Sequence, residues 1–579
     1  MNMKFVCIGH SCFWTRFALK PIQFMFCLLL ASGASAATFF WDADGAGSGT
    51  GGAGTWDATS SLWRSGTPVG TLSVWPNTAV NTDTAVFTNT AGSVTLNSSS
   101  TIINVNSVVF TNTTGTCVIA PPSSGTATLN FSGAAPSINQ TTVGASITAV
   151  ISGSDPLTRR ATTGSLIIAG NNTFSGGFTN ITTTGTLTIS NANSLGSGQV
   201  TMKQNAGGTS IGLRLSGGIK VANAINIDTS TGRENIDGVS GNNTLNGPIT
   251  ILGTTSSALI MANNDAANAG TTFAVSNSIS TSANFPNSLS MRPIAGNFVQ
   301  IAGTVNLATT ATLNINGAGT LIISSTGNVW GNLNLNGGGG TLKCGAANCL
   351  YSGSRVSANG GATNFLDLAG FDQAVAGLDS ITNNFLFITN GSVTSDATLT
   401  INTSGNLGTG GNVGTVFGFG GIIADGAHKL NLAVTGGTET FTNVNTYSGS
   451  TTISAGTLAL AATGSISNST KLSIATGAVF DVSAINNYTN FNAVLTASGS
   501  GTSVGTTAAT ITGGTSVNLG SKPIALNYTP ASSSGDLTSP ALYISQGSLI
   551  LNGQISVTNL SSPLGAGTYT LIQTAGRFD

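Results

Sequence analysis

A short pattern, Gly-x-Leu-x-Leu or a close variant of it, recurs through the chain from about Val94 onward, and Gly, Asn, Ser or Thr bounds each copy. Examples are "ATLNING", "GTLIISSTG", "GNLNLNGGGG" and "GSLILNGQISV". Alternation of apolar and polar residues over about four to eight positions is typical of a half-buried strand, and the bounding residues are turn formers. Helical periodicity is nowhere sustained. The pattern therefore predicts an all-β fold with almost no helix.

The spacing of these segments favours one all-β architecture over another. Leu313, Leu321, Leu333 and Leu342 open successive strands at intervals of 8, 12 and 9 residues, and no linker interrupts the series. A row of β-sandwiches would need a linker roughly every 100 residues, whereas each coil of a β-solenoid stacks only on its neighbours. We therefore expect a right-handed parallel β-helix (β-solenoid), with coils of roughly 20 to 25 residues spaced about 4.8 Å apart.

The low charge of the chain agrees with stacked coils. Only 6% of its 579 residues are charged, against roughly 25% in an ordinary soluble protein. Disorder requires low hydrophobicity and high net charge, and this chain has the opposite of both. Small or β-branched residues would fill the narrow interior of a coil, while Thr, Ser and Asn face water. Asn at the corners is expected to adopt left-handed backbone angles and to form ladders with Asn of the next coil.

Residues 37–93 differ from the rest because they hold four of the six tryptophans, Trp41, Trp56, Trp63 and Trp75. An open solenoid end exposes unpaired strand edges that invite aggregation. We interpret the segment as a Trp-rich N-terminal cap over the first coil. The alternative is a platform of exposed indole rings that contact carbohydrate.

Residues 1–36 have the features of a secretory signal peptide. Lys4, Arg16 and Lys20 precede the apolar run "PIQFMFCLLLASG", and Ala34–Ala36 form a small-x-small cleavage signal. We expect export and cleavage after Ala36, without a lipid anchor. No later segment approaches 18 uninterrupted apolar residues, so no helical membrane span is expected in the mature chain.

Cleavage would change the charge and the cysteine count. Three of the 17 Lys and Arg leave with the signal peptide, so 14 remain against 18 Asp and Glu. That balance excludes the basic surface of a nucleic-acid-binding protein. Cys117, Cys344 and Cys349 remain. Cys344 and Cys349, in "LKCGAANCL", are either a small-loop disulfide or two free thiols on a turn. The only mature histidine, His428, lies far from them in sequence, so we expect no metal site and no cofactor.

Two longer stretches carry a family resemblance. Residues 155–200 contain "GSLIIAGNNTFSGGFTNITTTGTLTIS", and residues 445–483 contain "NTYSGSTTISAGTLAL". Both resemble the autotransporter-associated β-strand repeat of large secreted bacterial passenger proteins. The match runs through Asn172 and Phe174 in one copy and through Asn445 and Tyr447 in the other. The opening "WDADGAG…TWD…LW" segment is also similar to the start of such proteins. The resemblance implies an exported, adhesin-like surface rod and supplies no catalytic residue.

Some polysaccharide-degrading enzymes are also parallel β-helices, so each cluster of charged residues is a candidate active site. Those enzymes bring several carboxylates, or a carboxylate and a base, to one face of the coil. The candidate clusters are Asp228, Arg233, Glu234 and Asp237, and Asp367, Asp372 and Asp379. We interpret both as solvated turns and predict that the chain is not an enzyme. The predicted function is a structural or adhesive surface protein whose partners are extracellular polysaccharide or cell-surface components. The alternatives are a carbohydrate-binding module and a polysaccharide lyase or hydrolase.

The predicted organisation is a signal peptide (1–36), the cap (37–93), the solenoid (94–500) and a β-rich continuation (501–579). The continuation contains neither the long strands of a translocator nor a sorting anchor. Release, retention by other means and an incomplete gene model are the three interpretations of that ending.

Overall fold

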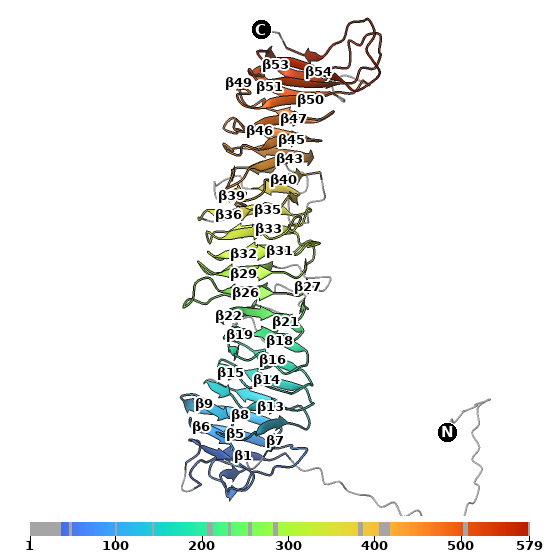
Figure 1. Cartoon of the computed structure of the whole chain (residues 1–579). Coiled ribbons are helices and arrows are strands. Elements are labelled where there is room, and N and C mark those ends of the chain that lie inside the picture. The colour runs from blue at the N-terminus through green and yellow to red at the C-terminus, as the bar shows by residue number, and fades with distance from the viewer. Residues whose placement is uncertain are drawn as a thin grey trace, which may run out of the picture. The chain divides into compact units, whose positions relative to one another are not determined.

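In most strands every second residue is apolar and buried, and this alternation builds a stack of parallel coils (Figure 1). The computed structural model describes residues 36–45, 49–98, 101–141, 144–204, 212–229, 233–252, 258–281, 288–359, 361–379, 386–404, 417–501 and 508–576. Within these ranges the regular elements are strands, and none is a helix. The predicted all-β parallel β-helix is confirmed.

Four sheets run through the N-terminal part of the stack. Sheet A contains, in spatial order, β4 (Leu72–Ser73), β3 (Trp63–Ser65), β1 (Thr38–Trp41), β5 (Thr84–Thr90), β8 (Ser107–Thr114), β11 (Ser137–Gln140), β14 (Leu157–Ala161), β16 (Phe178–Thr182), β18 (Val200–Gln204), β21 (Ile225–Thr229), β24 (Ile249–Ile251), β27 (Ile279–Thr281) and β30 (Val305–Asn306). Sheet B contains β2 (Gly54–Trp56), β6 (Ser93–Leu96), β9 (Cys117–Ala120), β12 (Ala145–Ile147), β15 (Leu166–Ile168), β17 (Leu187–Ile189), β19 (Leu213–Ser216), β22 (Arg233–Ser240), β25 (Ala258–Asn263), β28 (Ser288–Pro293), β31 (Thr312–Ile315), β33 (Asn332–Asn336), β35 (Arg355–Asn359) and β38 (Gly377–Asp379). Sheet C contains β7 (Ile102–Val105), β10 (Thr128–Phe131) and β13 (Val150–Ser152). Sheet D contains β20 (Lys220–Val221), β23 (Asn243–Leu245), β26 (Thr272–Val275), β29 (Phe298–Ile301), β32 (Thr320–Ile323), β34 (Thr341–Cys344), β36 (Asn364–Asp367), β39 (Leu386–Thr389) and β42 (Ile422–Ile423).

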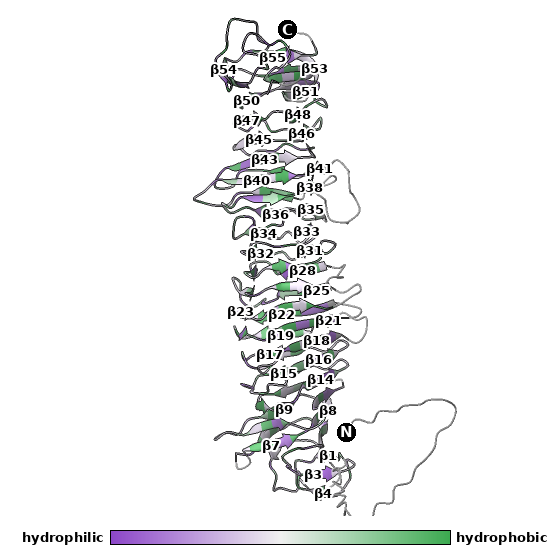
Figure 2. Ribbon diagram, turned by 90° about the vertical axis from the view of Figure 1, so that its right-hand side faces the viewer, coloured by the Kyte–Doolittle hydropathy of each residue, from purple (hydrophilic) through white to green (hydrophobic). Residues whose placement is uncertain are grey.

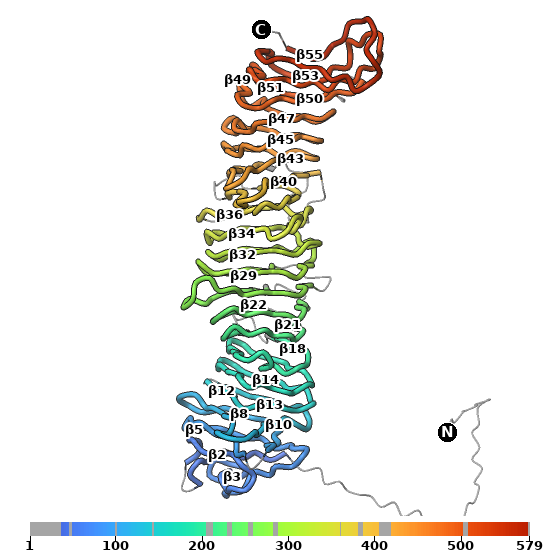
Figure 3. The backbone as a smooth tube through the Cα atoms, viewed as in Figure 1, coloured from blue at the N-terminus to red at the C-terminus, as the bar shows by residue number. Residues whose placement is uncertain are grey.

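Two sheets continue the stack toward the C-terminal side. Sheet E contains β37 (Gln373–Val375), β40 (Ala397–Asn402), β43 (Leu430–Gly436), β45 (Ser450–Ile453), β47 (Lys471–Ile474), β50 (Val494–Ser498), β52 (Ile524–Tyr528) and β54 (Ile555–Asn559). Sheet F contains β41 (Phe417–Phe419), β44 (Thr438–Phe441), β46 (Thr457–Leu460), β48 (Val479–Asp481), β51 (Ala509–Asn518), β53 (Leu542–Ile550) and β55 (Ile572–Thr574), and the additional strand β49 (Asn487–Thr489) pairs with β51. Figure 3 shows the backbone as successive turns of one stack.

The register of neighbouring strands shows how many residues each coil contains. Leu166 lies opposite Leu187, and Ile453 lies opposite Ile474, so the coils of the two repeat copies are equal in length and within the predicted range. Between β24 and β27 the partners are Ile249 and Ile279. The coil that joins them is longer than the predicted one, so the prediction is too short for this part of the stack.

The interior is a set of apolar columns. Leu313 and Ile315 of β31 lie opposite Leu333 and Leu335 of β33, and these four side chains are 0–1% exposed. Each fully buried side chain of this size contributes roughly 1.5–3 kcal/mol. Figure 2 shows how apolar and polar residues share the strands along the stack.

The four N-terminal tryptophans are buried in one aromatic cluster. Trp41, Trp56, Trp63 and Trp75 are at most 1% exposed. Ring centroids are 4.9 Å apart for Trp56 and Trp63 and 4.8 Å apart for Trp63 and Trp75. Antiparallel pairing of β1 with β3 and of β3 with β4 turns the chain back across the end of sheet A. The geometry of this segment is that of the predicted Trp-rich cap.

The aromatic residue of the repeat motif fills the corner of its coil. Phe174 and Tyr447 are 1% and 0% exposed. The preceding Asn links three coils: Asn172 accepts the Ile151 N–H at 2.7 Å and donates to the Ser194 carbonyl at 2.7 Å. The partners of this Asn are thus backbone groups. The predicted contact between Asn side chains of successive coils forms at the adjacent position, where Asn193 donates to the Asn171 side-chain oxygen at 2.8 Å.

Two other corners repeat this arrangement. Asn445 accepts the Ile423 N–H at 2.9 Å and donates to the Ser465 carbonyl at 3.3 Å. Asn328 accepts from Val305 N–H and donates to the Cys349 carbonyl, both at 2.8 Å, and it is followed by the buried Trp330.

Residues 37–579 form one unit. The predicted signal peptide falls, apart from Ala36, outside the described residues. The subdivisions at residues 93 and 500 remain interpretations of the sequence. Among the described residues, no helix has the length and apolarity needed to cross a bilayer.

Candidate functional site

The carbohydrate platform expected as the alternative to a cap is not available in the structure. Trp41, Trp56, Trp63 and Trp75 pack against one another, and Trp41, Trp56 and Trp63 also pack against Phe87. Burial leaves no indole face for a sugar. Composition alone could not separate the two interpretations, because both require clustered aromatic residues.

The prediction of a solvated turn is wrong for the first charged cluster, because its residues lie on strands β21 and β22, and Glu234 and Asp237 are buried. The cluster is divided between faces of the coil. Asp228 lies on sheet A and forms an exposed ion pair with Lys203 at 3.1 Å. On β22, Glu234 occupies the same column as the inward Leu259, whereas Asp237 occupies that of Ala262 on the outer face. Burial raises the pKa of Asp237, and the nearby Arg214 partly opposes that shift. The Arg233 side chain lies outside the described residues.

The second charged cluster consists of three separate structural contacts. Asp367 accepts the N–H groups of Ala369 and Gly391 at 2.9 and 2.7 Å. Asp372 accepts the Thr398 N–H at 2.7 Å, and Asp379 pairs with Arg355 at 2.7 Å. Each carboxylate is thus engaged in its own local contact. Among the described residues, no group of three or more His, Cys, Asp or Glu is placed to hold a metal ion.

Cys344 and Cys349 are both buried and carry free thiols that share a hydrogen bond. Burial raises the pKa of the Cys344 thiol well above its ordinary value. The two side chains are close neighbours across the turn of residues 345–348, so the disulfide stays a prediction about the oxidised protein.

In the described part of the chain, Arg159 and Glu439 lie inside the coil, as Glu234 does. Arg159 is fully buried and donates to the side-chain oxygens of Asn180 and Gln140, at 2.8 and 3.0 Å, and to two backbone carbonyls. Burial lowers the pKa of Arg159 to about 10. Glu439 is also fully buried and accepts the Leu378 N–H at 3.2 Å. Burial raises the pKa of Glu439 well above its ordinary value. Both side chains therefore make contacts inside the stack and not on its surface.

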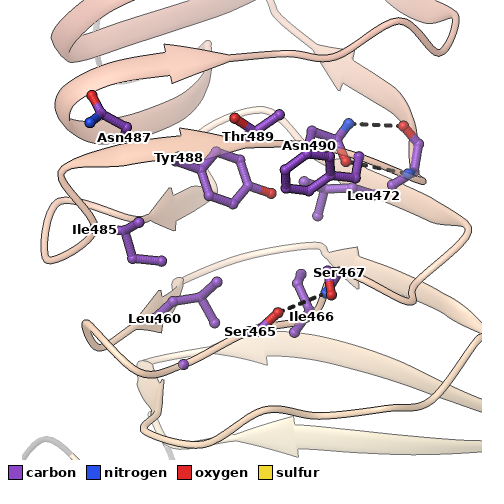
Figure 4. Close-up of a pocket in the computed structure, with 13 residues that line it drawn as sticks. Leu460, Ser465, Ile466, Ser467, Leu472, Ile485, Asn487, Tyr488, Thr489 and Asn490 are labelled. Atoms are coloured by element: carbon purple, nitrogen blue, oxygen red, sulfur yellow. Dashed lines mark hydrogen bonds between the residues drawn. The ribbon is translucent and has the colours of Figure 1, made fainter.

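A pocket of about 160 Å³ lies beneath the additional strand β49 (Figure 4). Its floor is apolar and comes from Leu460, Ile466, Leu472 and Ile485. Polar groups of the turn at residues 464–467 and of the segment at residues 487–490 surround this floor. The pocket therefore forms where the segment from Ile485 to Ala493 lies over the corner of the preceding coil.

Two aromatic side chains define the mouth and wall of this pocket. Phe491 is 66% exposed. The Tyr488 ring packs edge-on against Phe480 at 5.5 Å and points into the space above the 464–467 turn (Figure 4). Reasoning from the sequence missed this site. The signal that could have found it is "NNYTNFN", an Asn-rich stretch with two aromatic residues directly after the second repeat copy.

A second group of aromatic residues lies on the outer face of sheet D. Phe365 is opposite Phe387 on the next coil, with ring centroids 5.8 Å apart, and Phe365 is 38% exposed. The pair lies on the pleated surface of the sheet.

Comparison with known proteins gives one partial similarity. The "Adhesin BmaC autotransporter" of Brucella suis biovar 1 (strain 1330) is 36% identical to the chain over 151 residues, which are 26% of this chain and 4% of that protein. No known protein family matches the chain, and no solved structure matches it. The similarity supports a relationship to autotransporter passengers at family level at most.

Proposed function

We propose that this chain is an exported, non-enzymatic β-solenoid that acts at the bacterial cell surface as an adhesive or structural rod, like an autotransporter passenger. The observation that carries the proposal is the long parallel β-solenoid with a neutral polar outer surface. The partial similarity to an adhesin points in the same direction.

The outer face of sheet B illustrates this surface. Asn336 donates to the Asn314 side-chain oxygen at 3.0 Å, and Asn334 donates to the same oxygen at 3.4 Å. The Ser357 hydroxyl donates to the Asn334 side-chain oxygen. Amide and hydroxyl groups repeated on successive coils supply many weak contacts, which together give an avidity that no single contact has.

The placement of the predicted carboxylates supports a non-enzymatic role. They lie on different faces of the coil or make separate local hydrogen bonds and ion pairs. A glycosidase would instead hold two carboxyl groups within about 10 Å across one cleft.

The test is adhesion by a non-adherent bacterium that displays the full chain. We expect attachment to surfaces coated with extracellular polysaccharide or with host-cell surface components. Because the proposed contacts are uncharged, attachment should change little between low and high salt. Absence of attachment by the displayed, folded protein would refute the adhesive role. Cleavage of a polysaccharide panel by the purified protein would refute the non-enzymatic one.

A further inference from the structure

The size, the lining and the accessible polar groups of the pocket beneath β49 together indicate which kind of ligand it can bind. This inference deepens the proposed function and rests on it, because it names the chemistry through which the rod would contact a partner.

The size of the pocket suits one six-membered ring. Its volume is about 160 Å³, and a cavity of about 150 Å³ in another protein accommodates benzene. The pocket is too small for a nucleotide or a drug-sized cofactor, which occupy about 300 Å³ or more.

The lining excludes charged ligands. None of the side chains around the pocket is ionised at neutral pH, and burial raises the pKa of Tyr488 further above its ordinary value. A phosphate or carboxylate would find no cation here. The ligand must be neutral, with an apolar face for Leu460, Ile466 and Leu472 and polar groups for the rim.

The Tyr488 hydroxyl favours a sugar over an aromatic ligand. In the described part of the chain no protein group is hydrogen-bonded to this hydroxyl, and Tyr488 is half-buried, so water reaches the hydroxyl in the free protein. A ligand in the pocket would displace that water. An apolar aromatic ring would leave it unsatisfied, whereas a sugar hydroxyl would pair with it. Ser467 and Thr489 place two further hydroxyl-bearing side chains around the same space, and the exposed Phe491 ring lies at the mouth.

We propose that this pocket binds one neutral pyranose ring of a glycan. The C–H face of the sugar packs on the apolar floor and on Phe491, and a ring hydroxyl pairs with Tyr488. The affinity of one ring is on the order of millimolar, as expected for a ligand of this size. Display of many rods on one cell would multiply that affinity.

The experiment measures binding of neutral sugars to the purified protein by ligand-observed NMR. The probes are glucose, galactose, mannose, N-acetylglucosamine and their β-linked dimers, with p-cresol as the aromatic competitor. We expect saturable binding of at least one sugar. Tyr488→Phe, which removes only the hydroxyl, should weaken it about fivefold. Phe491→Ala should weaken it about three- to tenfold.

Phe365→Ala is the matched control, because it removes another exposed phenylalanine far from the pocket in the fold. It should leave the affinity unchanged, and all variants should keep the wild-type circular dichroism and unfolding temperature. The assignment is wrong if no sugar binds to the folded protein, if p-cresol binds and the sugars do not, or if both pocket variants bind like wild type.

Adhesion of cells that display the same variants separates this inference from the proposed function. If displayed wild-type protein adheres but no sugar binds, the pocket assignment is wrong and the adhesive role stands. If sugar binding is lost in the pocket variants while no form of the protein adheres, the pocket assignment holds and the adhesive role is wrong.

Discussion

Replacement of Asn172 by Ala should destabilise the stack at one corner by several kcal/mol. The Asn172 side chain is 4% exposed, and its two hydrogen bonds, both 2.7 Å long, link the preceding and following coils. Alanine leaves the Ile151 N–H and the Ser194 carbonyl without these partners. A buried unsatisfied polar group costs about 1–3 kcal/mol, so the two together cost about 2–6 kcal/mol.

Asn193→Ala is the matched control. Asn193 also links two coils, through a 2.8 Å hydrogen bond to the Asn171 side chain, but both residues are exposed. Water can replace that bond, so its loss should cost no more than about 0.5 kcal/mol.

Hydrogen exchange followed by mass spectrometry, together with urea unfolding, measures both variants. Stability in a stacked array is approximately a sum of local and nearest-neighbour contributions. We therefore expect Asn172→Ala to lower protection mainly between β13 and the turn near Ser194, and Asn193→Ala to change it little. Equal effects of the two variants would contradict the assigned role of the corner Asn, as would a loss of protection spread evenly over the stack.

Two further changes probe the cap and the interior. Trp56→Ala should lower the free energy of unfolding by about 3–5 kcal/mol, because it removes a fully buried ring, and it should raise hydrogen exchange in β1 and β5. The control is Val69→Ala, at a side chain that is 74% exposed. Equal unfolding midpoints of the two variants would contradict the cap. Burial raises the pKa of Glu439, so its contribution to stability is fully present below the unfolded pKa of about 4.3 and is lost as pH rises through the folded pKa. Glu439→Gln keeps an acceptor for the Leu378 N–H and cannot ionise, so its gain in unfolding free energy over wild type should grow as the pH rises above about 4 and level off above the folded pKa. A gain independent of pH would refute this.

Local patterns were sufficient to predict the architecture. The Gly-x-Leu-x-Leu segments correctly predicted strands such as β31 to β34, because the inward and outward sides of a strand follow from a two-residue period alone. Stacking followed from the short intervals between segments. Coil length was predicted correctly for the repeat copies and for coils such as the one from Leu313 to Leu333. The coil between Ile249 and Ile279 is longer, because the strand pattern does not encode the length of the segments that join the strands.

The pocket could not be predicted from the same patterns. It depends on β49, which pairs with the part of β51 that follows the register shift between β51 and β53. It also depends on contact between segments that belong to different coils. The third corner was missed for a related reason. Asn328 and Trp330 have the geometry of Asn445 and Tyr447 but lack the Ser-Gly that completes the motif in sequence.

The two repeat copies show how one corner design coexists with a local binding site. Asn172 and Asn445 lie far apart in sequence, yet each links the coil before it to the coil after it, and the two copies set coils of equal length. After the first copy the stack continues through β18 and β21. After the second copy the chain departs from the stack path at β49, and there the proposed ligand site is found. The Asn of the motif supplies the hydrogen bonds that the backbone needs at its own corner. An insertion directly after the motif can therefore change in sequence without disturbing the coil beneath the insertion. Such insertions are therefore where a stacked rod of this kind can gain a binding specificity.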